Sequence, residues 1–281
     1  MSLRALPPPG TPRVMGVLNL TPDSFSDGGL DERPADAVTR AVAMVEQGAA
    51  VIDIGAVSAR PGAERVAADE EWARLAPVLA SLRAAVDVPL SLETGSTDVL
   101  RRALDVGIDV VNDVSMLSCG DEFLGVVTDA GVPLVVMHTR GTPQTMQDDP
   151  RYDDAPAEVR DELLAAAGRA ERAGIGRERI LLDPGIGFGK TMEHNLALMA
   201  SLPELVALGH RTVLGCSRKS FLGALTGRDV EGREHATTAT TVLGALAGID
   251  FLRVHDVAAA TDALAVVTAV GGARQRRPLT C

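Results

Sequence analysis

Residues 14–55 read VMGVLNLTPDSFSDGGLDERPADAVTRAVAMVEQGAAVIDIG and contain one complete strand–helix–strand unit. The runs 14–20 and 51–55 are almost continuously apolar, as strands buried on both faces of a sheet should be. A helix is predicted between them at 35–47. Its apolar residues recur at the spacing of one helix face: Val38, Ala41, Val42 and Val45. The unit therefore predicts two parallel strands joined by a crossover helix.

The same alternation runs through the rest of the chain. Eight apolar runs are predicted as strands, and their starts lie 20 to 47 residues apart, which leaves room for a helix between most neighbours. These runs are 14–20, 51–55, 90–94, 110–114, 133–138, 180–183, 212–217 and 251–256. Further helices are predicted at 70–85, 98–106, 157–173, 196–208 and 257–270. Eight comparable units favour an α/β fold of the (β/α)8 TIM barrel type over an open doubly wound sheet.

The barrel is expected to form a single domain. Residues 13–271 would make the barrel, with an N-terminal extension at 1–12 and a C-terminal tail at 272–281. Of the 281 residues, 46% are hydrophobic, which is enough for a large core and excludes a disordered chain.

Composition argues against several classes of partner and site. The net charge of −11 repels nucleic-acid phosphates and anionic membranes, and 2% aromatic residues are too few for a base-stacking surface. Cys119, Cys216 and Cys281 include no close pair, which argues against disulfides and zinc and fits a reducing compartment. No apolar stretch is long enough to span a membrane, so the expected localisation is the cytoplasm.

Polar side chains follow each predicted strand. They are Asn19, Asp53, Glu93, Asn112, Asp113, His138, Asp183, Ser217, Arg218, Lys219, Arg253 and His255. Any one of them could cap the helix that comes next. In a barrel, however, all eight strand ends meet at one rim, where enzymes of this fold place their active sites. The whole set therefore predicts an active site at that rim.

The glycine-rich segment 184–191, PGIGFGKT, resembles a phosphate-binding loop but does not match it. The Walker pattern needs a glycine five residues before Gly189, and this chain has Pro184 there. We therefore interpret the segment as a tight turn that holds Asp183 in place. Phe188 in this turn could line a pocket or belong to the core.

Three roles suit Lys219: a Schiff-base lysine, a cation that binds a substrate carbonyl or phosphate, and a solvated lysine at the start of a helix. Arg218 precedes it, and Ser220 follows at a predicted helix N-terminus, whose free N–H groups bind anions. These neighbours favour binding of an anion or carbonyl over imine chemistry, which needs a desolvated lysine with few competing charges.

Taken together, these blocks resemble the dihydropteroate synthase family. The segment VMGVLNLTPDSFSDGG at 14–29 is similar to the opening strand and first loop of that family. Later blocks resemble it in the same order: 112–115, 137–138 with 140–143, 183–190, 217–223 and 253–256. The match runs from about Val14 to Val270, and it implies a (β/α)8 barrel.

The resemblance implies a reaction and its components. The family joins 6-hydroxymethyl-7,8-dihydropterin pyrophosphate to 4-aminobenzoate, which gives 7,8-dihydropteroate and pyrophosphate in folate biosynthesis. It also implies Mg²⁺ as the cofactor, these two small molecules as partners, and a homodimer.

The resemblance further implies which residues recognise the pterin. Asp183 and Asn112 would bond to its ring, because a carboxylate accepts paired hydrogen bonds from an aminopyrimidine edge and an amide both donates and accepts. Lys219 would bind the carbonyl edge of the ring. Arg253 would cover the ring face or contact phosphate. Phe188 would line the pocket.

Other residues would hold the leaving group and the second substrate. By resemblance, pyrophosphate would contact Asn19, Arg253 and His255, and Asn19 would also touch Mg²⁺. Ser220 would receive the aminobenzoate carboxylate at the helix N-terminus. The loop residues around this substrate would be Phe25, Arg60 and Pro61.

The predicted catalytic residues are Lys219, Arg253 and Glu93. Glu93 stands where the family has a shorter aspartate, near the methylene cation that develops in the reaction. Two more departures follow the second strand: Ala56 and Val57 replace glycine and glutamate, and Ala59 replaces a hydroxyl residue.

Two other functions would use the same barrel. A pterin-dependent methyltransferase would share Asn112 and Asp183, but it has no use for the block 217–220 or for the pair Arg253 and His255. A non-catalytic or weakly active pterin-binding paralogue is the second alternative, and the three departures motivate it.

Overall fold

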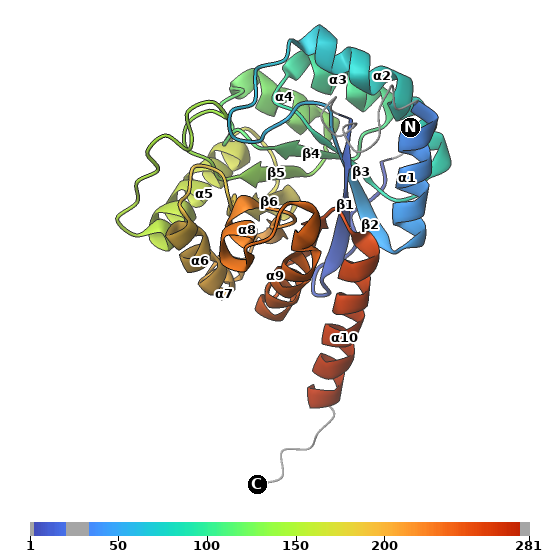
Figure 1. Cartoon of the computed structure of the whole chain (residues 1–281). Helices are drawn as coiled ribbons and strands as arrows, with labels where there is room; N and C mark the ends of the chain where they lie inside the picture. Colours follow the sequence, from blue (N-terminus) through green and yellow to red (C-terminus); the bar gives the residue numbers. More distant parts are fainter. Residues whose placement is uncertain (1–2, 21–33, 276–281) are drawn as a thin grey trace.

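Eight parallel strands close into a barrel in the computed structural model, which describes residues 3–20 and 34–275. Strands pair with their neighbours in chain order, and β8 pairs with β1 to complete the ring (Figure 1). The strands are β1 (Arg13–Asn19), β2 (Ala49–Gly55), β3 (Leu90–Glu93), β4 (Val110–Asp113), β5 (Leu134–Met137), β6 (Ile180–Asp183), β7 (Arg211–Leu214) and β8 (Phe251–Val254). The predicted (β/α)8 barrel is confirmed.

Helices surround the strands on the outside of the barrel (Figure 1). They are α1 (Pro34–Glu46), α2 (Ala68–Ala85), α3 (Thr97–Val106), α4 (Asp121–Ala130), α5 (Ala155–Arg172), α6 (Met192–Ala200), α7 (Leu202–Val206), α8 (Ser220–Thr226), α9 (Glu234–Ala247) and α10 (Val257–Gln275). In the part of the chain that the structure describes, no helix has both the length and the apolar character needed to cross a membrane.

Several boundaries differ from the predictions. The helix predicted at 196–208 is two helices, α6 and α7, because Pro203 near the start of α7 has no amide hydrogen with which α6 could continue. Strand β7 ends at Leu214, so the predicted strand residues up to Ser217 form a loop. Helix α10 continues through residues 272–275 of the predicted tail. Helices α4 and α9 have no counterpart among the predicted helices, whereas α8 begins at Ser220, where a helix N-terminus is predicted.

The barrel interior has an apolar layer towards the amino ends of the strands. It consists of Met15, Val51, Val110, Val135, Leu181, Val213 and Phe251. Side chains alternate in direction along a strand, so a residue two positions further on also points inward. On four strands that residue is polar: Asp53, Asn112, Asp183 and Arg253. The register therefore puts a polar layer above the apolar one, at the carboxyl ends of the strands.

The N-terminal segment packs against the opposite, amino-end opening of the barrel. Leu6 contacts the interior apolar layer, and the carbonyl oxygen of Pro7 accepts a hydrogen bond from Nη2 of Arg211 at 2.8 Å. The backbone amide of Arg4 donates to Oδ1 of Asp109 at 2.6 Å. The segment predicted as an extension therefore helps to cover this opening.

A buried ion pair stabilises the same end of the barrel. Nη1 of Arg83 on α2 lies 2.6 Å from Oδ2 of Asp109, and the two side chains are 4% and 2% exposed. Arg83 also donates to the carbonyl oxygens of Val86 and Val88, and Asp109 accepts from the amide of Leu90. The pair thus joins α2 to the starts of β3 and β4.

Asp109→Ala is expected to lower the free energy of unfolding by about 3–5 kcal/mol, because it leaves a buried arginine without its carboxylate. Urea denaturation measures this change. Asp98→Ala is the matched control, because Asp98 pairs with Arg101 at 3.5 Å on the surface and its loss should cost about 0.5 kcal/mol or less. Equal losses in the two variants would contradict the assignment.

Candidate active site

The centre of the polar layer is the fully buried carboxylate of Asp53. Its Oδ1 accepts from the hydroxyl of Ser91 at 2.5 Å, and its Oδ2 accepts from Nδ2 of Asn112 at 3.1 Å and from Nε of Arg253 at 2.6 Å. Nη2 of Arg253 donates in turn to Oε2 of Glu93 at 2.7 Å. Residues from β2, β3, β4 and β8 thus form one bonded group.

Charges within this group shift one another's protonation. Burial raises the pKa of Glu93 to about 7, although the attraction of Arg253 opposes that rise. Burial by itself would lower the pKa of Arg253. The carboxylates of Asp53 and Glu93 outweigh this effect, so the pKa lies above its ordinary value. The guanidinium therefore stays charged, while the Glu93 carboxyl can change protonation near neutral pH.

Asp183 and Lys219 form a second group beside the first. Oδ1 of Asp183 accepts from the amide of Gly185 at 2.7 Å. Nζ of Lys219 donates to the carbonyl oxygen of Ile186 and lies 4.6 Å from the centre of the Phe188 ring. Burial raises the pKa of Asp183 and lowers that of Lys219, and each charge opposes the shift of the other. A planar ligand with donors towards Asp183 and an acceptor towards Lys219 would satisfy both groups.

Gly215 separates the two groups at the end of β7. A Cβ atom at this position would lie 3.8 Å from Cδ of Arg253 and 3.9 Å from Oδ2 of Asp183. Since glycine has no side chain, the space between the guanidinium and the carboxylate stays clear. The fold thus places four of the predicted site residues at the same end of the barrel: Asn112, Asp183, Lys219 and Arg253.

His255 lies where several cations converge. Oγ of Ser217 lies 2.9 Å from Nδ1 of His255 and accepts the backbone amide hydrogen of His255 at 3.2 Å. The hydroxyl hydrogen is free to bond to Nδ1, and in the tautomer that accepts it the ring proton is on Nε2. Burial and four nearby cations lower the pKa of His255 to about 3, so the ring is neutral; these cations are Arg218, Arg253, Arg60 and Lys219. Their positive charge favours an anion at this place.

A cavity of about 410 Å³ lies beside Glu93, under the loop that follows β2. Its lining comes from that loop and from the segments after β3, β4 and β5. Three of its lining residues are departures from the family pattern: Val57, Ala59 and Glu93. The amide of Gly62 donates to the carbonyl oxygen of Pro143 at 2.8 Å and ties the loop across the cavity. These departures therefore occur at one place in the fold.

The remaining predicted site residues lie around this centre or outside the described residues. Ser220 begins α8 with an exposed side chain, and Arg60 and Pro61 are exposed on the loop after β2. Asn19 ends β1. Phe25 lies outside the described residues. The roles of these five residues stay predictions.

Two residues of the bonded group have no role among the sequence predictions. Asp53 stands there only as a strand-end polar residue, and Ser91 is absent from that set. The sequence feature that could have identified them is a polar residue inside an otherwise apolar strand, as in VIDIG and LSLE. This feature shows that the side chain needs a buried partner, but it does not show which one.

A closed parallel barrel with paired charges and an anion-attracting histidine at the carboxyl ends of its strands defines a (β/α)8 barrel enzyme. Comparison with known proteins then gives the family. Residues 15–255 match the family model described as pterin binding enzyme. The chain belongs to this family and, within it, to the dihydropteroate synthases.

Relatives match over almost the whole chain. The chain is 40% identical to dihydropteroate synthase of Escherichia coli over 266 residues, which cover 95% of this chain and 94% of that protein. It is 46% identical to the Mycobacterium leprae enzyme, with 92% and 93% covered. A solved structure of the Xanthomonas albilineans enzyme with 4-aminobenzoic acid has a TM-score of 0.87 at 44% identity, with 95% and 94% covered. The same enzyme has also been solved with 7,8-dihydropteroate.

Glu93→Gln is expected to change how stability depends on pH. A carboxyl whose pKa rises from 4.5 to about 7 on folding makes the folded state less stable as pH rises through that interval, because the unfolded chain ionises first. The glutamine variant lacks this contribution, so its free energy of unfolding should fall less between pH 4.5 and 7. Arg253 keeps Asp53 as its partner in the variant.

Urea denaturation across this pH interval measures the difference. Glu122→Gln serves as the control, because the side chain of Glu122 is exposed and pairs with Arg101 on the surface. If the free energy of unfolding depends on pH in the same way for wild type and Glu93→Gln, Glu93 ionises normally and the prediction is wrong.

Proposed function

We propose that the chain condenses 6-hydroxymethyl-7,8-dihydropterin pyrophosphate with 4-aminobenzoate, and so works as a dihydropteroate synthase. The observation that carries this proposal is the position of Asp183, Asn112 and Lys219 at the same barrel end as the cations around His255. The first set suits a pterin and the second suits a pyrophosphate. The similarity to the Xanthomonas albilineans enzyme, solved with 4-aminobenzoic acid and with 7,8-dihydropteroate, supports both substrates.

Asp183 would recognise the pterin through its carboxylate. One oxygen accepts from the amide of Gly185, which fixes the orientation of the side chain, and the other lies near Gly215 in the clear space beside Arg253. The aminopyrimidine edge of a pterin presents adjacent N–H donors to such a carboxylate. Asn112 would bond to the next part of the ring, and Nζ of Lys219 would donate to its carbonyl oxygen.

Arg253 would lie against the pterin and reach the pyrophosphate. Asp53 and Glu93 hold its guanidinium at Nε and Nη2. A planar guanidinium held in this way is suited to stacking on a flat ring and to donating to phosphate oxygens. This role requires Arg253 to remain charged, and its two carboxylate partners favour that state.

The pyrophosphate would lie between His255, Arg253 and Asn19. His255 would offer Nε2–H as a donor in the tautomer whose Nδ1 accepts from the hydroxyl of Ser217. The amide oxygen of Asn19 is a hard donor of the kind that Mg²⁺ prefers. Among residues 3–20 and 34–275 no group of three His, Cys, Asp or Glu could hold a metal by itself. This donor set fits a Mg²⁺ that arrives with the pyrophosphate, since Mg²⁺ in phosphate sites keeps waters and substrate oxygens as ligands.

4-Aminobenzoate would bind at the outer part of the site. Ser220 begins α8, whose first amide groups have no partner within the helix and so attract a carboxylate. Arg60 and Pro61 on the loop after β2 would flank the ring, together with Phe25. Bound there, the amine would face the pterin methylene group.

The reaction breaks the bond between the pterin methylene carbon and the pyrophosphate oxygen. A bond from the amine nitrogen to this carbon replaces it, and the nitrogen loses a proton. Bound Mg²⁺ would supply neutralisation of the charge on the departing pyrophosphate. Arg253 and His255 would donate to the same oxygens, and ionised Glu93 would stabilise positive charge on the methylene carbon. The aniline nitrogen is neutral at the start, so no strong base is needed for its attack.

A homodimer working in the cytoplasm completes the proposal. Helices α9 and α10 pack side by side (Figure 1). Both helices expose large apolar side chains, which are Leu243, Leu246, Val266 and Val270. An exposed apolar patch of this kind favours association with another protein surface. Cys119 and Cys216 are free thiols, which fits a reducing compartment.

The proposal is tested by adding both substrates and Mg²⁺ to the chain and measuring released pyrophosphate. Release should depend on each substrate, and removal of Mg²⁺ with EDTA should abolish it. Pterin binding without pyrophosphate release would identify a non-catalytic pterin-binding paralogue. Absence of pterin binding would refute the proposal.

Asp183→Asn is expected to weaken pterin affinity about 100-fold. The amide turns one acceptor into a donor that faces a ligand donor, and it removes a charge-assisted pair of hydrogen bonds. Calorimetry with 6-hydroxymethylpterin measures the affinity. Asp98→Asn on the surface of α3 is the control and should bind as wild type does. An unchanged affinity in Asp183→Asn would refute the role of this carboxylate.

Leu246→Glu is expected to convert the proposed dimer into monomers, because it places a charge in the apolar patch on α9. Light scattering should give twice 29.3 kDa for wild type and 29.3 kDa for the variant. Leu164→Glu on α5 provides an exposed leucine outside the patch as the control. A monomeric wild type would show that this patch does not join two copies.

A further inference from the structure

The chain has only two lysines, Lys190 and Lys219, although it has 25 arginines. Both lysines contact the glycine-rich turn at 184–190. Lys219 donates to the carbonyl oxygen of Ile186 in this turn and belongs to the proposed pterin site. Lys190 is the last residue of the turn and has no role in the reaction described above.

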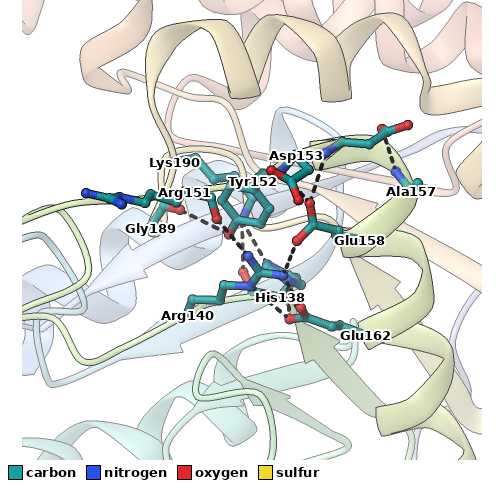
Figure 2. Close-up of polar contacts among 11 residues, drawn as sticks. His138, Arg140, Arg151, Tyr152, Asp153, Ala157, Glu158, Glu162, Gly189 and Lys190 are labelled. Carbon is teal, nitrogen blue, oxygen red and sulfur yellow. Dashed lines mark hydrogen bonds and ion pairs between the residues drawn. The ribbon is translucent and has the colours of Figure 1, made fainter.

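The ammonium group of Lys190 points into the protein, where the residue is only 3% exposed. Its Nζ lies 2.9 Å from Nδ1 of His138 (Figure 2) and 3.5 Å from the carbonyl oxygen of the same residue. It also lies 2.9 Å from the carbonyl oxygen of Phe188. An ammonium has three N–H donors and finds three acceptors here. The lysine of the GKT segment is therefore an internal cross-link and does not face a phosphate.

His138 connects Lys190 to α5 through a contact with Glu162. Because Nδ1 accepts from Lys190, the ring proton lies on Nε2, which is 3.0 Å from Oε2 of Glu162. Arg140 also donates to Glu162, through Nε at 3.0 Å (Figure 2). The hydroxyl of Tyr152 donates to the carbonyl oxygen of Gly189 at 3.1 Å and holds the end of the same turn.

The turn itself packs directly against the end of β5. Gly185 has φ of +65°, and a Cβ there would lie 1.8 Å from the carbonyl oxygen of His138. On the other side, a Cβ at Gly187 would lie 3.1 Å from Cδ of Lys219. The backbone is thus enclosed between the His138 carbonyl, which Lys190 also approaches, and the side chain of Lys219.

We propose that Lys190 is a positioning residue for the pterin site: by tying the turn to His138, it fixes the Ile186 carbonyl and the Phe188 ring that hold Lys219 beside Asp183. Lys190 touches no substrate in this role. The inference rests on the proposed function, because Lys219 and Asp183 are its pterin-binding groups.

Geometry accounts for lysine at this position in a chain that has 25 arginines and two lysines. A compact ammonium satisfies three acceptors at short range, whereas a guanidinium is planar and has five N–H donors in a fixed fork. In a side-chain position that is 3% exposed, the extra donors would lack partners. Arg140, which is half-buried, contacts the same cluster from its outer side and shows where an arginine fits (Figure 2).

The surroundings also make the charge of Lys190 sensitive to pH. Burial and repulsion from Lys219 lower the pKa of Lys190 to about 7, although Asp183 opposes this shift. The other charged or titratable groups facing it are His138, Arg140, Glu162 and Tyr152. Burial lowers the pKa of His138 to about 3, so that ring stays a neutral acceptor. Loss of the Lys190 proton above neutral pH removes one of its three donors.

Two lysines allow a direct test by NMR of protein labelled with ¹³C at lysine Cε. Lys190→Met leaves one lysine signal, that of Lys219, and this signal should shift from its wild-type position because its carbonyl partner moves. The dissociation constant for 6-hydroxymethylpterin should rise about 10-fold, as loss of one charge-assisted hydrogen bond would produce. The KM for the pterin substrate should rise more than kcat falls.

Arg151→Met is the matched control, because it removes a neighbouring positive charge whose side chain is 82% exposed and forms a surface ion pair with Asp149. The backbone carbonyl oxygen of Arg151, which accepts from Arg140, is retained. This control should leave both the Lys219 signal and the pterin affinity as in wild type. Thermal denaturation of each variant checks that it is folded.

The result that overturns the inference is a folded Lys190→Met protein whose Lys219 signal and pterin affinity equal those of wild type. If that variant does not fold, Lys190→Gln is measured in the same way. Wild type supplies a further test, because pterin affinity should fall as the Lys190 signal titrates. An affinity that stays constant while Lys190 loses its proton also overturns the inference. The NMR comparison needs no ligand, so it stands even if the chain fails to bind pterin.

Discussion

The hydrogen bonds of Arg253 to Asp53 and Glu93 are the interaction on which the arrangement of the site depends. Charges inside a barrel are costly unless each has a partner, and this guanidinium gives a partner to two carboxylates at once. Asn112 joins the group because Asp53 has a lone pair left to accept from it. Asp183 remains outside the group, across the gap that Gly215 leaves, and so keeps an oxygen for a ligand.

Because all eight strands run in the same direction, the two ends of the barrel differ: the amino ends contribute to stability and the carboxyl ends form the site. At the amino ends, the Arg83–Asp109 pair and the N-terminal segment join helices and strands through hydrogen bonds within the protein. At the carboxyl ends, the polar groups have only part of their hydrogen-bonding capacity used. A change at the first end affects stability, whereas a change at the second affects binding.

The turn at 184–190 shows how packing changes the meaning of a motif. Its letters resemble a phosphate-binding loop, but the side chain of Lys190 enters the interior and bonds to His138. The glycines let the backbone lie against the end of β5, where a Cβ would collide with a carbonyl oxygen. The turn therefore holds Lys219 through the Ile186 carbonyl oxygen, and its glycines allow the backbone to pack closely against its neighbours.

The sequence by itself determined the barrel, because continuous apolar runs separated by helical segments leave few other ways to bury both faces of a sheet. It also located Asn112, Asp183 and Arg253 near the carboxyl ends of strands and Lys219 in the segment after the seventh strand. Only the tertiary structure decided their partners: Arg253 meets Asp53 through closure of the ring between β8 and β1, at a separation of 200 residues. Local pattern carries no information on such a contact, nor on whether Lys190 points inward or outward, since both depend on where other parts of the chain lie.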